Sequence, residues 1–371
     1  MKLRRAPLED WLRDYYFDAR IDISSSGVEP YAMTDLFRLT ALEPEDLADV
    51  VFRDSRSCGA PELRAAIAER WGDGDLGRVM VTSGSGEVQY MVLTTILRPG
   101  DEVVVVEPAY HTLVGIAEAI GCKIVPWKLR WEDGFAPDLD ELATLVTPRT
   151  RAVIANFPHN PTGMSVSPQE QSRIVDIARM HGTYLIWDSV FADMTYDHGT
   201  PPNPAMSYAR AISFGTLSKG LGLPGLRVGW CFAPEELIEE LVVLRDYTTL
   251  ALSPLVETVA LHAVRGADAL LEPRMRLVRE NVERVAAWVD DHEDHVGWVR
   301  PHGGAVAFPR LHGVDDEVFC DRLMRDHGVL LVPGSCFGSR GHVRLGFGVP
   351  ADQLDDGLSA MSSLLGHGVR P

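Results

Sequence analysis

Short apolar runs alternate with helical patterns between residues 60 and 235. The runs do not alternate polar and apolar residues, as Val103-Val104-Val105-Val106 illustrates. Strands of this kind are buried on both faces, and helices between them favour a mostly parallel sheet covered on both sides. The pattern predicts seven strands, at residues 78–82, 101–106, 122–127, 152–156, 183–187, 211–214 and 227–232, separated by helices such as 87–97 and 169–181.

The pattern changes after Pro234. Two long helical stretches, 235–247 and 255–292, precede short strands and a last helix from Ala351. We place the short strands at 304–308, 329–332 and 342–347. The sequence therefore predicts an α/β protein with a large domain (41–245), a smaller α+β domain (246–371) and an N-terminal segment (1–40) that packs on the small domain.

Composition narrows the class of protein. The 371 residues are enough for two domains of ~100–200 residues each. The formal charge of 35 − 53 = −18 disfavours nucleic acid as the main partner, because phosphate backbones bind basic surfaces. No apolar stretch reaches the ~18 residues of a membrane span, and no secretory signal is recognisable. Five widely spaced cysteines without a C-x-x-C pair indicate reduced thiols in a cytoplasmic protein.

The segment 213–230 carries the strongest chemical signal. A strand leads into a glycine-dense turn that contains Lys219, one of only four lysines, and Arg227 follows eight residues later. A lysine among apolar groups has a lowered pKa, and its free amine can form a Schiff base. Arg227, with the hydroxyls of Thr216 and Ser218, suits a phosphate dianion. The alternative for a lone lysine is a solvated loop position, which is the commoner state.

Two nearby patterns do not support the functions that they suggest. Residues 220–225 match the G-x-G-x-x-G fingerprint, but a strand follows where dinucleotide binding requires a helix, and Pro224 interrupts the turn. The stretch 292–295 (His-Glu-Asp-His) has the composition of a metal site, yet sequential ligands rarely converge on one ion. We therefore predict neither a nicotinamide cofactor nor a metal.

Three further segments bring polar groups to the carboxyl edge of the sheet, where ligands of such sheets bind. Residues 84–86 (Gly-Ser-Gly) lie between a strand and a helix, and free backbone N–H groups at such a turn bind phosphate. Asn160 follows the strand 152–156 in a proline-flanked turn, and Asp188 follows the strand 183–187. Asp188 either stabilises a buried cation, such as a protonated pyridine nitrogen, or caps the next helix.

These segments, in this order, resemble the pyridoxal-phosphate enzymes of the class I/II aminotransferase superfamily (fold type I) over residues 20–365. The resemblance implies that Lys219 joins the cofactor covalently, that Asp188 pairs with its pyridine nitrogen and that Asn160 bonds its phenolic oxygen. Tyr110 would stack on the pyridine ring, and Arg344 would bind the substrate α-carboxylate. The implied phosphate cup consists of Gly84, Ser85, Gly86, Thr216, Ser218 and Arg227. A homodimer with shared active sites is implied as well.

Two departures from the superfamily pattern set this chain apart. Phe191 stands where a tyrosine usually bonds the phenolic oxygen, and the tyrosine usually found before Gly59 is missing. Removing a donor to the phenolate should raise the pKa of the imine nitrogen, because the charged form loses a hydrogen bond.

A narrower resemblance, to the capreomycidine synthases, accounts for both departures. It rests on residues 6–12, 22–28, 52–54, 156–161 and 213–219. It implies cyclisation of (2S,3S)-3-hydroxyarginine to capreomycidine, in the biosynthesis of an arginine-derived antibiotic. Ser25 and Gly27 would then belong to a substrate-side loop, although a plain turn is an equal alternative. For the departing hydroxyl the economical acid is Lys219, and Asp193 and Glu29 are candidate acceptors for the guanidinium.

Two other functions remain open at this point. An aminotransferase acting on arginine or a related amino acid would share the cofactor and the lysine, so motifs do not separate it from a cyclase. A non-catalytic effector-binding domain can also be built on this fold. Such domains are commonly fused to a DNA-binding segment, for which the first 20 residues are too short.

Overall fold

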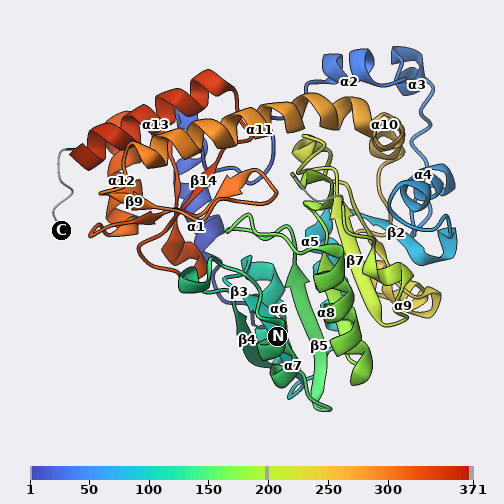
Figure 1. Cartoon of the computed structure of the whole chain (residues 1–371). Helices are drawn as coiled ribbons and strands as arrows, with labels where there is room; N and C mark the ends of the chain where they lie inside the picture. Colours follow the sequence, from blue (N-terminus) through green and yellow to red (C-terminus); the bar gives the residue numbers. More distant parts are fainter. Residues whose placement is uncertain (1, 197–199, 367–371) are drawn as a thin grey trace.

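The large domain is built on a seven-stranded sheet. The structure is a computed structural model that describes residues 2–196 and 200–366; Met1 and residues 367–371, the ends of the predicted terminal segments, lie outside the described residues. The strand order is β2-β8-β7-β6-β5-β3-β4, and β8 runs antiparallel to the other six strands (Figure 1). The strands are β2 (Val79–Thr82), β3 (Glu102–Glu107), β4 (Lys123–Lys128), β5 (Thr150–Asn156), β6 (Tyr184–Asp188), β7 (Ala211–Thr216) and β8 (Gly229–Phe232).

The predicted mostly parallel sheet is thus confirmed, with small shifts at strand ends. One of these shifts concerns Arg227, which we expected within the last strand. Its φ of 56° places it in the left-handed region, so β8 begins only at Gly229. The strand begins later than expected because the short 3-10 helix η5 (Pro224–Leu226) precedes it and Arg227 is the C-cap of that helix.

Helices cover both faces of the sheet and create two hydrophobic clusters. Alternate residues of β3 enter different clusters: Val103 and Val105 face one, Val104 and Val106 the other. This explains why the strand shows no polar alternation. The helices of this domain are α4 (Pro61–Trp71), α5 (Ser85–Ile96), α6 (His111–Ile120), α7 (Leu139–Leu145), α8 (Pro168–Met180) and α9 (Glu235–Arg245).

Most of the rest of the chain forms a second layer of short sheets and long helices, which we call the small domain. Its strands are β9 (Val296–Gly297), β10 (Val306–Ala307), β11 (Arg310–Leu311), β12 (Val329–Leu330), β13 (Val332–Pro333) and β14 (Val343–Gly346). Its helices are α11 (Ala267–Asp290), α12 (Asp316–His327) and α13 (Ala351–Gly366), whereas α10 (Pro254–Arg265) packs on α4 of the large domain. The single long helix expected over 255–292 is wrong, because it breaks at Gly266, which packs so closely on Thr40 that a Cβ would lie 2.8 Å from its Cγ2.

The N-terminal residues join both layers. They form α1 (Pro7–Tyr15), β1 (Ile21–Asp22), α2 (Met33–Leu39) and α3 (Pro44–Ala48). Strand β1 pairs in parallel with β12, whereas α3 contacts α10. The division of the chain at residues 40 and 245 stays a prediction. Within the described ranges, none of the helices combines the length and the apolar character needed to cross a bilayer.

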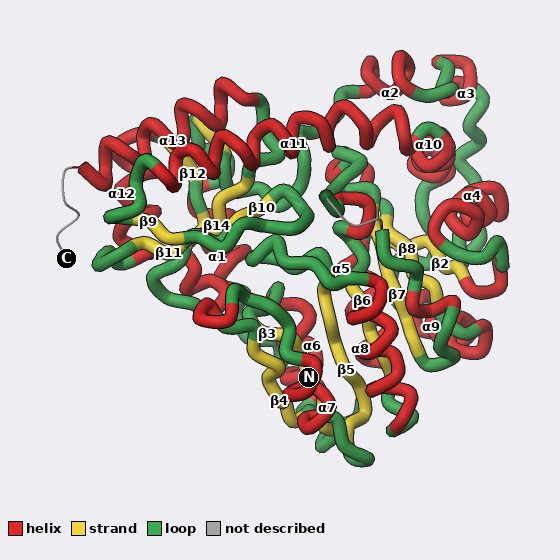
Figure 2. Tube along the Cα trace, viewed as in Figure 1, coloured by secondary structure: helices red, strands yellow, loops and turns green. Residues whose placement is uncertain are grey.

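The carboxyl ends of the parallel strands point toward the small domain. The arrow of β5 is directed at the region of α1 and β14 in Figure 1, and Figure 2 shows that loops fill this zone. The turn between β2 and α5 lies at the same edge, directly against β8. A Cβ on Gly229 would lie 2.6 Å from Gly84 C and Ser85 N, so only glycine permits this approach.

We therefore expect Gly229→Ala to destabilise the protein by about 1–3 kcal/mol, because the added methyl group meets backbone rather than a mobile side chain. Gly225→Ala is the matched control, since no atom lies within 4 Å of the added Cβ. It should change stability by less than about 0.5 kcal/mol. Denaturant unfolding of the three proteins checks this, and equal effects of the two substitutions would contradict it.

Candidate active site

Lys219 lies partly buried just beyond the end of β7. Its Nζ donates a hydrogen bond to Ser26 Oγ at 2.9 Å and lies 5.7 Å from the centre of the Phe191 ring. Burial lowers the pKa of Lys219 to about 8, and the charge of Arg344 adds to this effect, while Asp188 and Glu9 oppose it. About a tenth of this amine is therefore neutral at pH 7, far more than for an ordinary lysine, and the neutral form is the one that attacks a carbonyl carbon.

Asp188 ends β6 and is buried. Its carboxylate accepts a hydrogen bond from the backbone N–H of Val190 at 3.1 Å. Burial raises the pKa of Asp188 to about 7, although that N–H and Lys219 favour the charged form. It does not cap a helix, because the next one, η3 (Ala192–Met194), has Phe191 at its N-cap. The structure thus argues against the interpretation of Asp188 as a helix cap and favours its interpretation as the partner of a buried cation.

A phosphate-sized set of donors lies at one end of the same site. Gly84, with φ of 78°, precedes the first turn of α5, and Arg227 Nη2 lies 2.7 Å from where its Cβ would be. Thr216 Oγ1 and Ser218 Oγ are 3.0 Å apart beside them. Backbone N–H groups at a helix start, a guanidinium and two hydroxyls together suit a dianion.

These groups share one cavity of about 200 Å³. Of the residues predicted to bind the cofactor, all but Gly84 line it: Ser85, Gly86, Tyr110, Asn160, Asp188, Thr216, Ser218, Lys219 and Arg227. Ser26, Gln89, Thr112 and Phe191 line it too. The set fits pyridoxal phosphate, because it combines an amine, a carboxylate and a phosphate cup around an aromatic side chain.

Arg344, on β14, does not line this cavity but contacts Asn160, which does. Its Nη1 donates to Asn160 Oδ1 at 3.2 Å, and its Nε and Nη2 donate to the carbonyl oxygen of Ser24 at 3.2 and 2.8 Å. Burial lowers its pKa to about 10. No carboxylate forms an ion pair with Arg344 in the described part of the chain, so its guanidinium can accept a substrate carboxylate.

The loop 24–27 lies between Arg344 and Lys219, but Ser26 rather than Ser25 supplies its side chain to the cavity. Ser25 Oγ accepts a hydrogen bond from the backbone N–H of Gly27 at 3.2 Å, as in a tight turn. A Cβ on Gly27 would lie 3.1 Å from the carbonyl oxygen of Ser218. Gly27 therefore allows close approach, while Ser25 shapes the turn.

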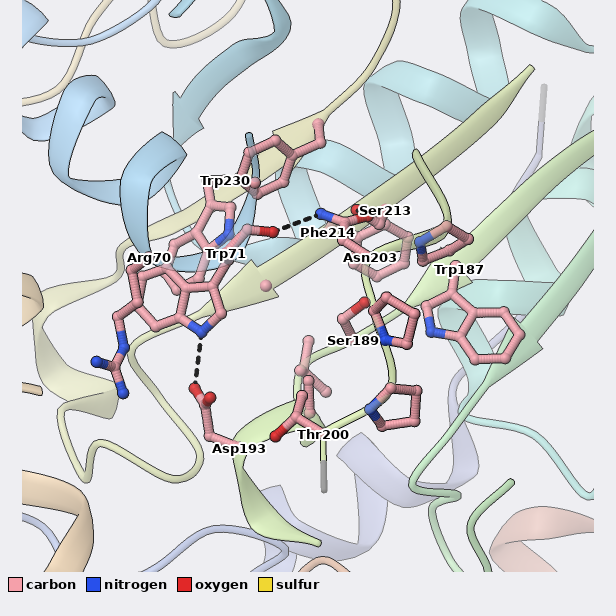
Figure 3. A pocket seen from close by; sticks show the side chains of 18 of the residues that line it. Arg70, Trp71, Trp187, Ser189, Asp193, Thr200, Asn203, Ser213, Phe214 and Trp230 are labelled. Carbon is pink, nitrogen blue, oxygen red and sulfur yellow. Dashed lines mark hydrogen bonds between the residues drawn. The ribbon is translucent and has the colours of Figure 1, made fainter. Parts of the chain in front are cut away.

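Neither acid that the sequence suggested for the guanidinium lines this cavity. Asp193 accepts a hydrogen bond from Trp71 Nε1 at 2.9 Å in a separate cavity of about 580 Å³ (Figure 3). Trp71, Trp187 and Trp230 line that second cavity, and Lys219 does not. Glu29 forms an ion pair with Arg274 at 2.5 Å.

Sequence reasoning missed one acidic residue close to the site. Glu9, on α1, accepts a hydrogen bond from the hydroxyl of Tyr110 at 2.9 Å. Its only sequence signal is its place within residues 6–12, one of the segments that carry the narrower resemblance.

The two patterns rejected above have structural roles. Residues 220–225 lead into η5 and then β8 instead of a helix that begins within the glycines. His292 stacks on Trp288 with ring centres 4.8 Å apart. Over residues 2–196 and 200–366, no three His, Cys, Asp or Glu side chains are arranged to hold a metal ion.

Asp188→Asn should stabilise the protein without added cofactor, and the gain should depend on pH. The folded pKa of about 7 exceeds the ordinary 3.8, so the folded state retains a proton that the unfolded chain loses. Wild-type stability therefore falls relative to the variant as pH rises from about 4 to about 7, and the difference is constant above that. Denaturant unfolding across this range measures it.

The control is Asp10→Asn. Arg5 and Arg13 lower the pKa of Asp10, so this substitution should bring no gain in stability at any pH. A pH-independent difference between wild type and Asp188→Asn would contradict the prediction.

Comparison with known proteins agrees with this geometry. Residues 46–361 match the family model of aminotransferase class I and II. Capreomycidine synthase of Streptomyces vinaceus is 48% identical over 371 residues, covering 99% of this chain and 95% of that enzyme. The arginine–pyruvate transaminase AruH of Pseudomonas aeruginosa is 32% identical over 307 residues, covering 80% and 78%.

The solved structures agree as well. The PLP-dependent cyclase OrfR has a TM-score of 0.94 to this chain at 41% identity, with 99% and 98% of the two chains covered. A PLP-dependent aminotransferase from Streptococcus suis has the same TM-score at 29% identity, with both chains covered completely. The predicted fold type I architecture is thereby confirmed, and the chain belongs to the class I and II aminotransferase family.

Proposed function

We propose that this protein is a pyridoxal-phosphate enzyme that cyclises (2S,3S)-3-hydroxyarginine to capreomycidine, in the biosynthesis of an arginine-derived antibiotic. The observation that carries the proposal is the site around Lys219, in a chain 48% identical to a capreomycidine synthase over almost its whole length. The solved relative described as a PLP-dependent cyclase supports it further.

The cofactor, when bound, supplies an electron sink for the bonds at the substrate Cα. The chain's own residues would hold it at three points. Arg227, Ser218 and the first turn of α5 would bind the phosphate, Lys219 would bind the aldehyde carbon, and Asp188 would keep the ring nitrogen protonated. The buried carboxylate of Asp188 would gain a cation as partner, which offsets the cost of its charge.

Lys219 would also carry the protons of the reaction. Once released by the incoming amino group, its neutral amine removes the proton from Cα, and its ammonium form then protonates the departing 3-hydroxyl, which leaves as water. A guanidine nitrogen bonds to Cβ and loses a proton, which Lys219 returns to Cα. The product therefore equals the substrate minus one water. A pKa near 8 suits both roles, since the two forms interconvert easily near neutral pH.

Arg344 would orient the substrate by holding its α-carboxylate next to Asn160. A fixed carboxylate limits rotation of the amino acid, so the side chain has to fold back over Cβ to close the six-membered ring. Effective molarity in such closures contributes about 7–11 kcal/mol at best.

A second candidate function is transamination of arginine or a related amino acid. The arginine–pyruvate transaminase relative favours it, although at 32% identity rather than 48%. Its chemistry would use the same Lys219, so the two candidates differ in product rather than in catalytic group.

Incubation of the holoenzyme with 3-hydroxyarginine should yield a product lighter by one water, without consumption of any keto acid. Lys219→Ala should abolish both this product and the visible absorbance of the bound cofactor, because the reactive amine is absent. Mass spectrometry and absorbance measure the two effects. Formation of a keto acid from hydroxyarginine would support the aminotransferase instead.

We also infer a homodimer. Phe52 and Tyr247 are 77% and 86% exposed, and Val51 and Leu250 are exposed as well. Phe52 and Leu250 line the same surface hollow. Exposed apolar side chains that gather in one place typically mark an interface.

Five free cysteines, of which Cys231 and Cys320 are buried, fit the proposed cytoplasmic location.

Phe52→Glu should shift the protein from dimer toward monomer, because a carboxylate would be buried against apolar groups of the second copy. Met180→Glu is the control, since Met180 is equally exposed at 78% but lies on α8, away from this patch. Sedimentation velocity distinguishes the species. A wild-type monomer at micromolar concentration would contradict the inference.

A further inference from the structure

Helix α1 places one acidic side chain beside the catalytic cavity. The helix is fixed to the small domain, since Trp11 Nε1 donates to the carbonyl oxygen of Leu331 at 2.9 Å and Tyr15 donates to Asp321 at 2.7 Å. Leu8 is buried in a hydrophobic cluster. Glu9 is only partly buried, and it faces the opposite domain, where Tyr110 donates to its Oε1.

The carboxylate of Glu9 has hydrogen-bond acceptor positions to which no described residue donates. Tyr110 is a neutral donor, and no basic side chain among the described residues pairs with Glu9. A carboxylate offers about four acceptor positions, so one hydroxyl leaves most of them free. The charge of Glu9 nevertheless acts on the site, because it raises the pKa of both Lys219 and Arg344.

Other acids near the site already have partners or lie elsewhere. Asp188 faces the proposed ring nitrogen, and Asp22 accepts hydrogen bonds from the backbone and hydroxyl of Ser24. Asp193 belongs to the second cavity, and Glu29 is paired with Arg274. Glu9 does not itself line the cavity, but of the acids considered it alone combines a free oxygen with contact to a side chain, Tyr110, that does.

A substrate with a guanidinium group needs a carboxylate as its partner in this site. Its side chain brings a positive charge into a site that already holds Lys219, Arg227 and Arg344, so an unpaired guanidinium would be repelled and poorly solvated. A carboxylate can bind a guanidinium through two parallel hydrogen bonds.

We propose that Glu9 is the specificity residue that binds the substrate guanidinium, with Tyr110 holding its carboxylate in place. This inference rests on the proposed function, because it presumes an arginine-derived substrate. Arg344 then fixes one end of the amino acid and Glu9 the other, and the side chain is held between them near Cβ.

The test compares two ligands of equal length that cannot cyclise, L-arginine and its neutral analogue L-citrulline, as competitors of hydroxyarginine on the holoenzyme. We expect wild type to bind arginine about 10- to 100-fold more tightly, the range of a charge-assisted hydrogen bond. Glu9→Gln, which still accepts the Tyr110 hydroxyl, should bring this ratio close to one by weakening arginine alone. Glu9→Asp should restore part of it.

Glu29→Gln and Asp193→Asn are matched controls, and both should keep the wild-type ratio. A Glu9→Gln protein that retains the ratio, or that weakens both ligands equally, would overturn the role of Glu9, the second result showing that it only positions Tyr110. The proposed function would stand in either case if wild type still released water from hydroxyarginine. A wild type that does not distinguish arginine from citrulline and forms no cyclic product would overturn both proposals.

Discussion

The site depends on three charged groups buried together in a medium that solvates them poorly. Lys219, Asp188 and Arg344 are each shifted by burial toward their neutral forms, with pKa values of about 8, 7 and 10. Such a cluster costs free energy in the empty protein, and a bound ligand with complementary charges recovers it. The protein is therefore organised to be completed by a cofactor and a zwitterionic substrate.

The backbone of the fold holds these charged groups together despite the unfavourable free energy of their burial. Parallel strands β5, β6 and β7 deliver Asn160, Asp188 and Lys219 to one edge, and their order in the sheet sets the spacing between these residues. The phosphate end relies on close backbone approach, where Gly84 and Gly229 leave no room for a side chain. Strands β5, β6 and β7 are buried along almost their whole length, which keeps the reactive groups in place.

The two layers of the molecule contribute different residues to the proposed site. The large domain contributes Lys219, Asp188 and the residues of the proposed phosphate cup. The substrate side is contributed by Arg344, the loop with Ser26 and helix α1 with Glu9, all of which come from sequence far from Lys219.

The sequence by itself determined the mostly parallel sheet and marked Lys219, because non-alternating strands and a lysine in a glycine-rich turn are local signals. The roles of the cofactor residues stay predictions, which rest on the resemblance. Strand ends moved by a few residues, and a long helix proved to be two, since tight packing of Gly266 on Thr40 is a contact between distant segments. Only the tertiary structure decided which acids face the substrate. Asp193 and Glu29 looked suitable in sequence but point elsewhere, whereas Glu9 lies 101 residues from Tyr110 and meets it only because α1 folds back across the two domains.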